Sequence, residues 1–225
     1  MSLTACEKEI FNRILKEELV PATGCTEPVA IAYAAAAAKK ALGCEPEVCE
    51  AELSGNIIKN ARCVAVPNTG GLKGIEAAVA AGVVAGRAEL ALDVLSSASG
   101  REEEIRDFLE KRGVSVRPAD NDLTFFIRVT VGAGSSRAKA VIEGFHTNLV
   151  LIEKDGRELF RSGAKSNPCC VADRSMLTVE KIVEFADVAD LDEIREILER
   201  QIAFNSAISE EGLKGDWGAN VGKVI

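Results

Sequence analysis

Residues 21–28 combine side chains whose types and spacing could carry chemistry. The segment reads PATGCTEP, so Cys25, Thr26 and Glu27 directly precede a run of helix-forming alanines. Free N–H groups and the helix dipole stabilise a thiolate at a helix N-terminus and lower the pKa of a cysteine there. Cys25 is therefore predicted to act as a nucleophile or as a metal ligand.

The composition narrows these two roles. A nucleophilic cysteine needs a base, and the only histidine, His146, lies far along the chain at the end of an expected strand. Because the chain has a single histidine, a zinc site with several histidine ligands is excluded. A soft iron site with thiolate ligands stays open. The chain has seven cysteines and no CxxC pair, and six of them are expected to be reduced and structural: Cys6, Cys44, Cys49, Cys63, Cys169 and Cys170.

A second polar region covers residues 54–74, with the sequence SGNIIKNARCVAVPNTGGLKG. It fits neither a P-loop nor a dinucleotide-binding fingerprint. Backbone donors before the following helix could still hold a small anion such as a carboxylate. A glycine-rich turn that lets an alanine-rich helix pack closely is the competing interpretation. The residues predicted to converge on a ligand beside Cys25 are Asn56, Lys59, Asn60, Thr69, Gly70 and Lys73.

Hydrophobic periodicity predicts the elements that position these residues. Apolar spacing predicts a helix over 7–19 and another over 26–42, with Thr26 as its capping hydroxyl and Gly43 as its end. A strand is expected near 47–55 and a buried helix over 75–85. Between residues 114 and 160 the pattern alternates as in strands, and Asp155-Gly156 marks a hairpin.

The switch in periodicity predicts an α+β fold with two parts. Residues 1–86 and 175–225 are expected to form a helical lobe of catalytic type, incomplete because the chain stops in sequence of buried character. Residues 87–174 are expected to form an inserted α/β module of mostly antiparallel strands.

Charge and hydropathy exclude several classes of partner. The 225 residues carry a net charge of −8, which argues against binding to nucleic acid or to an anionic membrane surface. The N-terminal residues lack the uninterrupted apolar core of a secretory signal, and the apolar stretches are too short to span a bilayer. A cytoplasmic location is expected.

Four blocks together resemble a known family. In order they are EELVPATGCTEPVAIAYAAAAA, SGNIIKN, PNTGGLKGIEAA and GLKGDWGANVGK. They resemble the iron–sulfur L-cysteine desulfidases, which are similar to the catalytic chain of the iron–sulfur L-serine dehydratases. The resemblance spans essentially the whole chain as the N-terminal portion of that family, and the GCTEP block is its most specific element.

The resemblance implies an α,β-elimination that converts L-cysteine into hydrogen sulfide, ammonia and pyruvate. It implies a [4Fe–4S] cluster held by three cysteines, of which Cys25 matches the first. The other two belong to the C-terminal half of that family, so the chain as given is expected to lack the cluster and to be inactive. Lys73 and Glu27 are candidates for the α-proton base, and Thr26 joins the predicted substrate contacts.

Two alternatives stay open beside this hypothesis. The chain could be an amino-acid-binding regulatory module without catalysis, or an L-serine dehydratase-type deaminase. Nothing in the residues separates cysteine from serine as substrate, identifies the base, or decides whether the chain forms a homo-oligomer.

Overall fold

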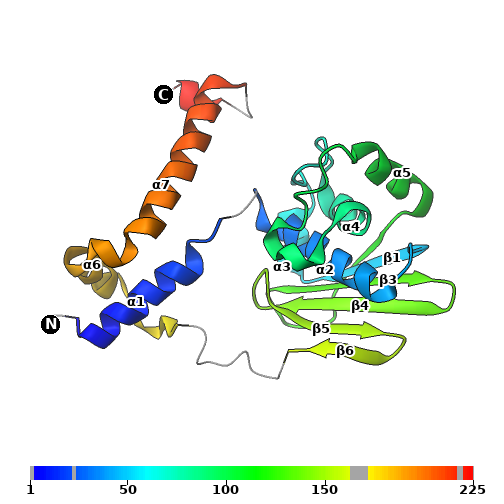
Figure 1. Ribbon diagram of the computed structural model, residues 1–225, viewed down its shortest axis with the longest axis horizontal. Helices are drawn as coiled ribbons and strands as arrows, with labels where there is room; N and C mark the ends of the chain where they lie inside the picture. The colour runs from blue at the N-terminus through cyan, green and yellow to red at the C-terminus, as the bar shows by residue number, and fades with distance from the viewer. Residues whose placement is uncertain (1–2, 22–23, 163–171, 217–219, 225) are drawn as a thin grey trace. The chain divides into compact units, whose positions relative to one another are not determined.

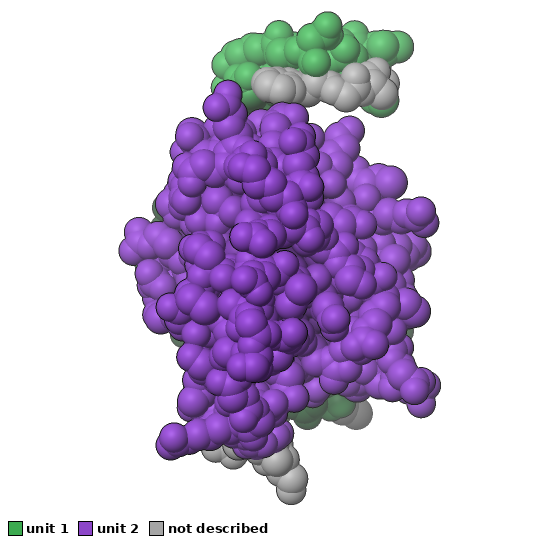
Figure 2. All heavy atoms as spheres, turned by 90° about the vertical axis from the view of Figure 1, so that its right-hand side faces the viewer, with its two compact units in different colours: residues 1–21, 165–225 green, residues 22–164 purple. Residues whose placement is uncertain are grey.

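The computed structural model describes residues 3–21, 24–162, 172–216 and 220–224. These residues fold into helices and a six-stranded, mostly antiparallel sheet, so the predicted α+β class is confirmed. The chain divides into two compact units, shown in different colours in Figure 2. Unit 1 comprises residues 1–21 and 165–225, and unit 2 comprises residues 22–164.

Unit 2 contains the sheet and the helices that cover one of its faces (Figure 1). Its elements are α2 (Thr26–Leu42), β1 (Val48–Leu53), α3 (Gly55–Ala61), α4 (Gly74–Ala85), η1 (Ala88–Asp93), α5 (Glu102–Arg112), β2 (Ser115–Pro118), β3 (Phe126–Ala133), β4 (Ser136–Glu143), β5 (Leu149–Lys154) and β6 (Arg157–Arg161).

The sheet has the strand order β2-β1-β3-β4-β5-β6, in which only the β1–β2 pair is parallel. Register places Ala51 of β1 opposite Val129 of β3, and Val129 opposite Ala140 of β4. Because side chains alternate across a strand, this row and its neighbours two residues away point to the same face. All three side chains are fully buried there. The alternation predicted from the sequence therefore identifies the covered face.

The alanine-rich helix α2 lies against this face. It contacts β3, β4 and β5 on one side and α4 on another, so it is buried almost all round. A helix that is apolar on every side needs such a position. Gly82 of α4 allows the close approach, since a Cβ there would lie 2.8 Å from the Cα of Ala32. The predicted end of α2 is confirmed, because Gly43 has a φ of +83°.

The sheet also corrects the predicted domain boundary. The sequence pattern places residues 48–53 in the helical lobe, yet in the structure they form β1, which pairs with β2 and β3 from the expected insert. No boundary between the two units falls near residue 86, because α2 and α4 bury their apolar faces against each other and the sheet. Periodicity reports each local element, whereas the partner of a strand is a long-range choice.

Unit 1 is small and helical. It contains α1 (Ala5–Glu18), η2 (Arg174–Met176), α6 (Val179–Val188), α7 (Leu191–Lys214) and α8 (Val221–Val224). The side chains of Thr4 and Glu7 form a reciprocal capping box at the start of α1. The rings of Phe11 in α1 and Phe185 in α6 stack with their centroids 4.9 Å apart, so the N-terminal helix packs against a helix of the C-terminal segment. Within the described ranges, no helix is both long and apolar enough to cross a bilayer.

Candidate active site

The N-terminus of α2 carries the first pair of interacting polar side chains. Cys25 is the N-cap residue, and its side chain makes no capping hydrogen bond. Its Sγ donates instead to Oε2 of Glu27 at 3.0 Å. Both side chains are half-buried. The thiol and the carboxylate are therefore a hydrogen-bonded pair at the positive end of a 17-residue helix.

Asn60 fixes the other oxygen of the same carboxylate. It lies on α3, a short helix within the region that the sequence predicted to be a connection, and its Nδ2 donates to Oε1 of Glu27 at 3.1 Å. The hydroxyl of Ser54, just before α3, donates to the carbonyl oxygen of Thr124 at 2.9 Å. This bond ties the start of α3 to the segment that leads into β3. The Glu27 carboxylate is thus held through both oxygens.

His146 reaches the same helix end from the connection between β4 and β5. Its Nε2 lies 2.9 Å from Oγ1 of Thr26, within hydrogen-bond distance. Its ring packs edge-on against Phe125, with centroids 4.7 Å apart and an interplanar angle of 70°. The predicted capping role of Thr26 is therefore wrong, because its hydroxyl pairs with the imidazole. The sequence offered no local signal for this pairing beyond the presence of a single histidine.

The surroundings shift three pKa values. Burial, and then the hydrogen bond to Glu27, raise the pKa of the Cys25 thiol, contrary to the lowering predicted from the helix dipole. The hydrogen bond from Cys25 lowers the pKa of Glu27. Burial lowers the pKa of His146, and the charge of Glu27 opposes that shift. At neutral pH the site therefore holds a thiol, a carboxylate and a neutral imidazole.

The remaining predicted ligand contacts differ in exposure. Asn56, Lys59 and Lys73 are exposed, and within the described part of the chain no hydrogen bond links their side chains to Glu27. Thr69 is 1% exposed, and its hydroxyl donates to the carbonyl oxygen of Val66 at 2.8 Å. The structure thus joins Asn60 to the pair at α2, while convergence of the other residues stays a prediction.

Residues 65–73 form a tight loop in which Ala65 pairs with Lys73. Gly70 has a φ of +64°, and a Cβ at this position would lie 2.9 Å from the side chain of Glu102. At the other side, a Cβ on Gly24 would lie 3.6 Å from Cγ of Pro67. The loop therefore lies beside the residue that precedes Cys25, which keeps it adjacent to the start of α2.

The described cysteines do not form a cluster site by themselves. Cys6, Cys25, Cys44, Cys49 and Cys63 are free thiols, and no group of three potential metal ligands occurs among the residues that the structure describes. Cys49 is buried in the sheet, where burial raises its pKa to about 12. Cys169 and Cys170 lie outside the described residues. The described residues thus offer one thiol, that of Cys25, at the candidate site.

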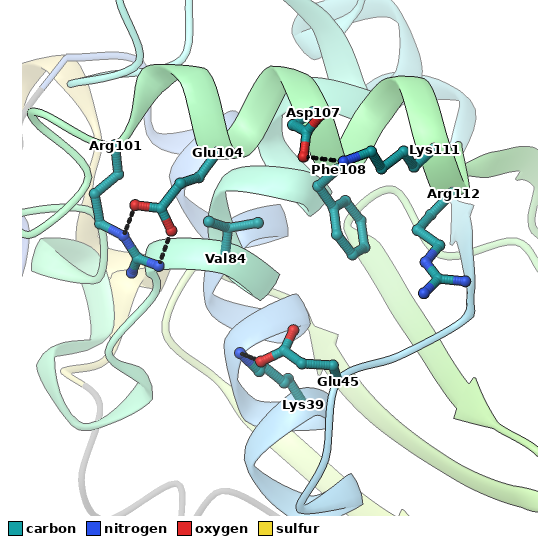
Figure 3. A pocket seen from close by; sticks show the side chains of 9 residues that line it. All are labelled: Lys39, Glu45, Val84, Arg101, Glu104, Asp107, Phe108, Lys111 and Arg112. Carbon is teal, nitrogen blue, oxygen red and sulfur yellow. Dashed lines mark hydrogen bonds and ion pairs between the residues drawn. The ribbon is translucent and has the colours of Figure 1, made fainter.

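A separate pocket of about 300 Å³ lies between α2, α4 and α5 (Figure 3). It is lined by Lys39, Glu45, Val84, Arg101, Glu104, Asp107, Phe108, Lys111 and Arg112. Most of its charges are paired within the lining, as in the ion pair of Lys39 with Glu45 at 2.6 Å. None of the residues predicted for the site lines this pocket, and its paired, solvent-facing charges do not point to a particular ligand.

Comparison with known proteins identifies relatives along nearly the whole chain. A UPF0597 protein of Desulfitobacterium hafniense is 45% identical over 219 residues, which are 96% of this chain and 51% of the relative. One from Treponema denticola is 40% identical over 230 residues, covering 100% of this chain and 53% of the relative. One from Fusobacterium nucleatum is 39% identical over 216 residues, covering 95% of this chain and 51% of the relative.

No protein-family model matches the chain, and no solved structure does. The chain spans about half the length of the curated relatives it matches. Identities near 40% over more than 200 residues are far above chance, so the similarity reflects common descent. The chain is therefore a homologue of the UPF0597 proteins.

Proposed function

We propose that this chain contributes part of the active site of a lyase that carries out α,β-elimination on L-cysteine. The observation that supports the proposal is the linked group Cys25–Glu27–Asn60 at the start of α2. Cys25 and Glu27 belong to the GCTEP block, the block that most specifically resembles the iron–sulfur L-cysteine desulfidases. The names of the UPF0597 relatives specify no reaction, so the chemistry is our inference from the site.

We assign the removal of the α-proton to Glu27. Its pKa is lowered, so the carboxylate is ionised at neutral pH, and Asn60 holds one of its oxygens in place. Transfer of the α-proton to Glu27 leaves an electron pair that forms the Cα–Cβ double bond. The Cβ–S bond breaks, sulfide takes a proton, and the aminoacrylate tautomerises and hydrolyses to pyruvate and ammonia. Lys73, exposed at the start of α4, is the second candidate for this proton transfer.

The start of α2 also suits the carboxylate of the substrate. Unpaired N–H groups at the N-terminus of a long helix attract anions. Thr26 and His146 lie together at this end. When Nε2–H of His146 donates to Oγ1 of Thr26, the Thr26 hydroxyl is free to donate to the substrate carboxylate. A substrate bound there would place its Cα near Glu27. Because the imidazole of His146 is neutral, it does not form an ion pair with the carboxylate of Glu27.

In the iron–sulfur L-cysteine desulfidases, which the sequence resembles, a [4Fe–4S] cluster supplies a Lewis-acidic iron. Cys25 would hold such a cluster through its half-buried Sγ after losing its proton to solvent, which leaves Glu27 ionised for the α-proton. The described residues alone do not fit the cluster, because Cys25 stands there without further thiolates. We propose that the other ligands come from sequence corresponding to the half of the relatives that this chain does not span.

A chimera tests the proposal with the two halves covalently joined. The matched part of the Desulfitobacterium relative is replaced by this chain, the protein is reconstituted anaerobically with iron and sulfide, and pyruvate and sulfide are measured with L-cysteine and with L-serine. We expect turnover of L-cysteine, and a loss of at least 100-fold with Glu27→Gln at unchanged iron content. A folded chimera with a cluster that releases pyruvate from L-serine alone would favour the deaminase instead. A folded, cluster-containing chimera inactive on both would refute the lyase.

A further inference from the structure

The C-terminal part of α7 is exposed on all sides. Every residue from 199 to 214 is exposed, whereas Ile194, nearer the start of the helix, is buried. In proteins most of the stability of a helix comes from packing of its apolar face rather than from helix propensity. The 16 exposed residues at one end of this 24-residue helix lack that contribution in the chain as described.

The exposed part of α7 is strongly amphipathic. At 100° per residue, Ile202, Phe204, Ile208 and Leu213 fall within one half of the helix circumference, and they are 50–70% exposed. Charged residues occupy the opposite half: Glu196, Glu199, Arg200 and Glu210. We call the first half, defined by its four large side chains, the apolar face of α7. Exposed apolar patches of this kind mark interaction sites.

The rest of unit 1 has only a small buried core. Its buried cluster consists of Leu3, Phe11 and Phe185, with Leu15, Met176 and Ala189 packed against it. On α8, Val221 and Val224 are 61% and 84% exposed. A core of this size rarely stabilises a separate unit. Among its described residues, unit 1 thus exposes more large apolar side chains than it buries, which favours contact with a further polypeptide.

The length of the relatives indicates what that polypeptide is. Proteins 39–45% identical to this chain share its fold, so they carry the counterpart of α7, and each has about as many residues again outside the match. We infer that the apolar face of α7 is the docking surface for a polypeptide homologous to that remaining half. This inference depends on the exposure of α7 and not on the reaction proposed above.

Co-expression of two separate chains tests the inference. The full 225-residue chain is produced together with the unmatched half of the Desulfitobacterium relative, and the complex is isolated and its Kd measured by calorimetry. The variant Phe204→Ala/Ile208→Ala truncates the apolar face, and Glu199→Ala/Glu210→Ala is the matched control on the charged half. Alanine favours helix in both, and circular dichroism checks that helix content is kept.

We expect a complex whose Kd rises at least ten-fold with Phe204→Ala/Ile208→Ala and less than three-fold with the control, since truncating a central apolar anchor costs about 1–2 kcal/mol. No complex, or equal effects of the two variants, would overturn the inference. So would a chain that is dimeric alone and made monomeric by Phe204→Ala/Ile208→Ala, because a second copy would then occupy the face. Hydrogen-exchange protection of residues 199–214 in the isolated chain would show that the chain covers the face itself.

Discussion

The Sγ of Cys25 donates a hydrogen bond to Oε2 of Glu27 across 3.0 Å at the N-terminus of α2. The helix dipole favours the thiolate at this position, but the neighbouring carboxylate and partial burial favour the thiol, and their combined effect is larger. Cys25 is therefore a protonated cysteine at neutral pH. The following predictions test this pair and the fold that positions it.

Neutralising Glu27 should make Cys25 more acidic. Glu27→Gln keeps an oxygen that can accept a hydrogen bond but removes the negative charge that disfavours the thiolate, so the pKa of Cys25 should fall. The measurement is the pH dependence of iodoacetamide labelling at Cys25, resolved by peptide mass spectrometry. Glu103→Gln, on the exposed side of α5, is the control and should leave the labelling profile unchanged. A Glu27→Gln profile that matches the unsubstituted chain would contradict this account of the pair.

The single histidine should titrate below its usual range. Burial lowers the pKa of His146 below 6.5, and the Glu27 carboxylate limits the shift, so Glu27→Gln should lower it further. As pH falls, His146 takes up a proton at a higher pH in the unfolded state than in the folded state. The free energy of unfolding should therefore decrease as pH falls from 6.5 towards the folded-state pKa. NMR of the imidazole protons gives the value without ambiguity, since the chain has one histidine. A His146 pKa that does not change with Glu27→Gln would show that the carboxylate does not act on this ring.

Filling the close contact between α2 and α4 should destabilise unit 2. Gly82→Ala places a methyl group against the backbone of Ala32, and overpacking of this kind costs about 1–3 kcal/mol. Urea denaturation followed by circular dichroism measures the change in the free energy of unfolding. Gly55→Ala, at the first position of α3 with no heavy atom within 4 Å of its new Cβ, is the matched control. Equal stability of the two variants would argue against the tight packing of α2 on α4.

A carboxylate that joins three strands should give unit 2 a pH-dependent stability. Glu52 of β1 is 8% exposed and pairs with Arg117 of β2 at 2.9 Å and with Arg128 of β3. The Arg128 hydrogen bond, above all, lowers the pKa of Glu52, so its stabilisation is present above pH 4.5 and is lost as pH falls through the lower folded-state value. Since both arginines are partly exposed, Glu52→Gln should cost about 2 kcal/mol at pH 7.

The difference in the free energy of unfolding between Glu52→Gln and the unsubstituted chain should be smaller at pH 3 than at pH 7. Urea denaturation at both pH values measures it. Glu50→Gln is the control on the same strand, because its carboxylate is exposed and 3.8 Å from Arg117. A Glu52→Gln cost that is the same at pH 3 and pH 7 would assign the effect to packing rather than to charge.

The chain without a partner should not retain an iron–sulfur cluster. A [4Fe–4S] cluster needs several thiolates close together, and the described residues place only Cys25 at the candidate site. Anaerobic reconstitution of the 225-residue chain should give a colourless protein with no stoichiometric iron, and Cys25→Ser should not change that result. Stoichiometric iron in the chain alone would contradict the assignment and would direct attention to the other six cysteines.

The sequence alone determined the local elements and the residues worth testing. The bounds of α2 follow from Pro28 in its first turn and Gly43 at its end, because proline fits the first turn and glycine the left-handed cap. The turn between β5 and β6 follows from Asp155-Gly156, which adopt φ values of +50° and +77° as a tight hairpin requires. The motif around Cys25 also selected Glu27, and the polar region 54–74 selected Asn60; the structure joins these two side chains.

Only the tertiary structure decided which of these elements meet. β1 pairs with strands more than 60 residues away in sequence, and no local propensity specifies such a partner, so the predicted boundary at residue 86 was misplaced. His146 meets Thr26 across 120 positions because the β4–β5 connection ends beside α2. The pKa of Cys25 likewise depends on burial and on the direction of the Glu27 side chain. Periodicity and turn chemistry act over a few residues, whereas pairing, burial and charge proximity are set by packing.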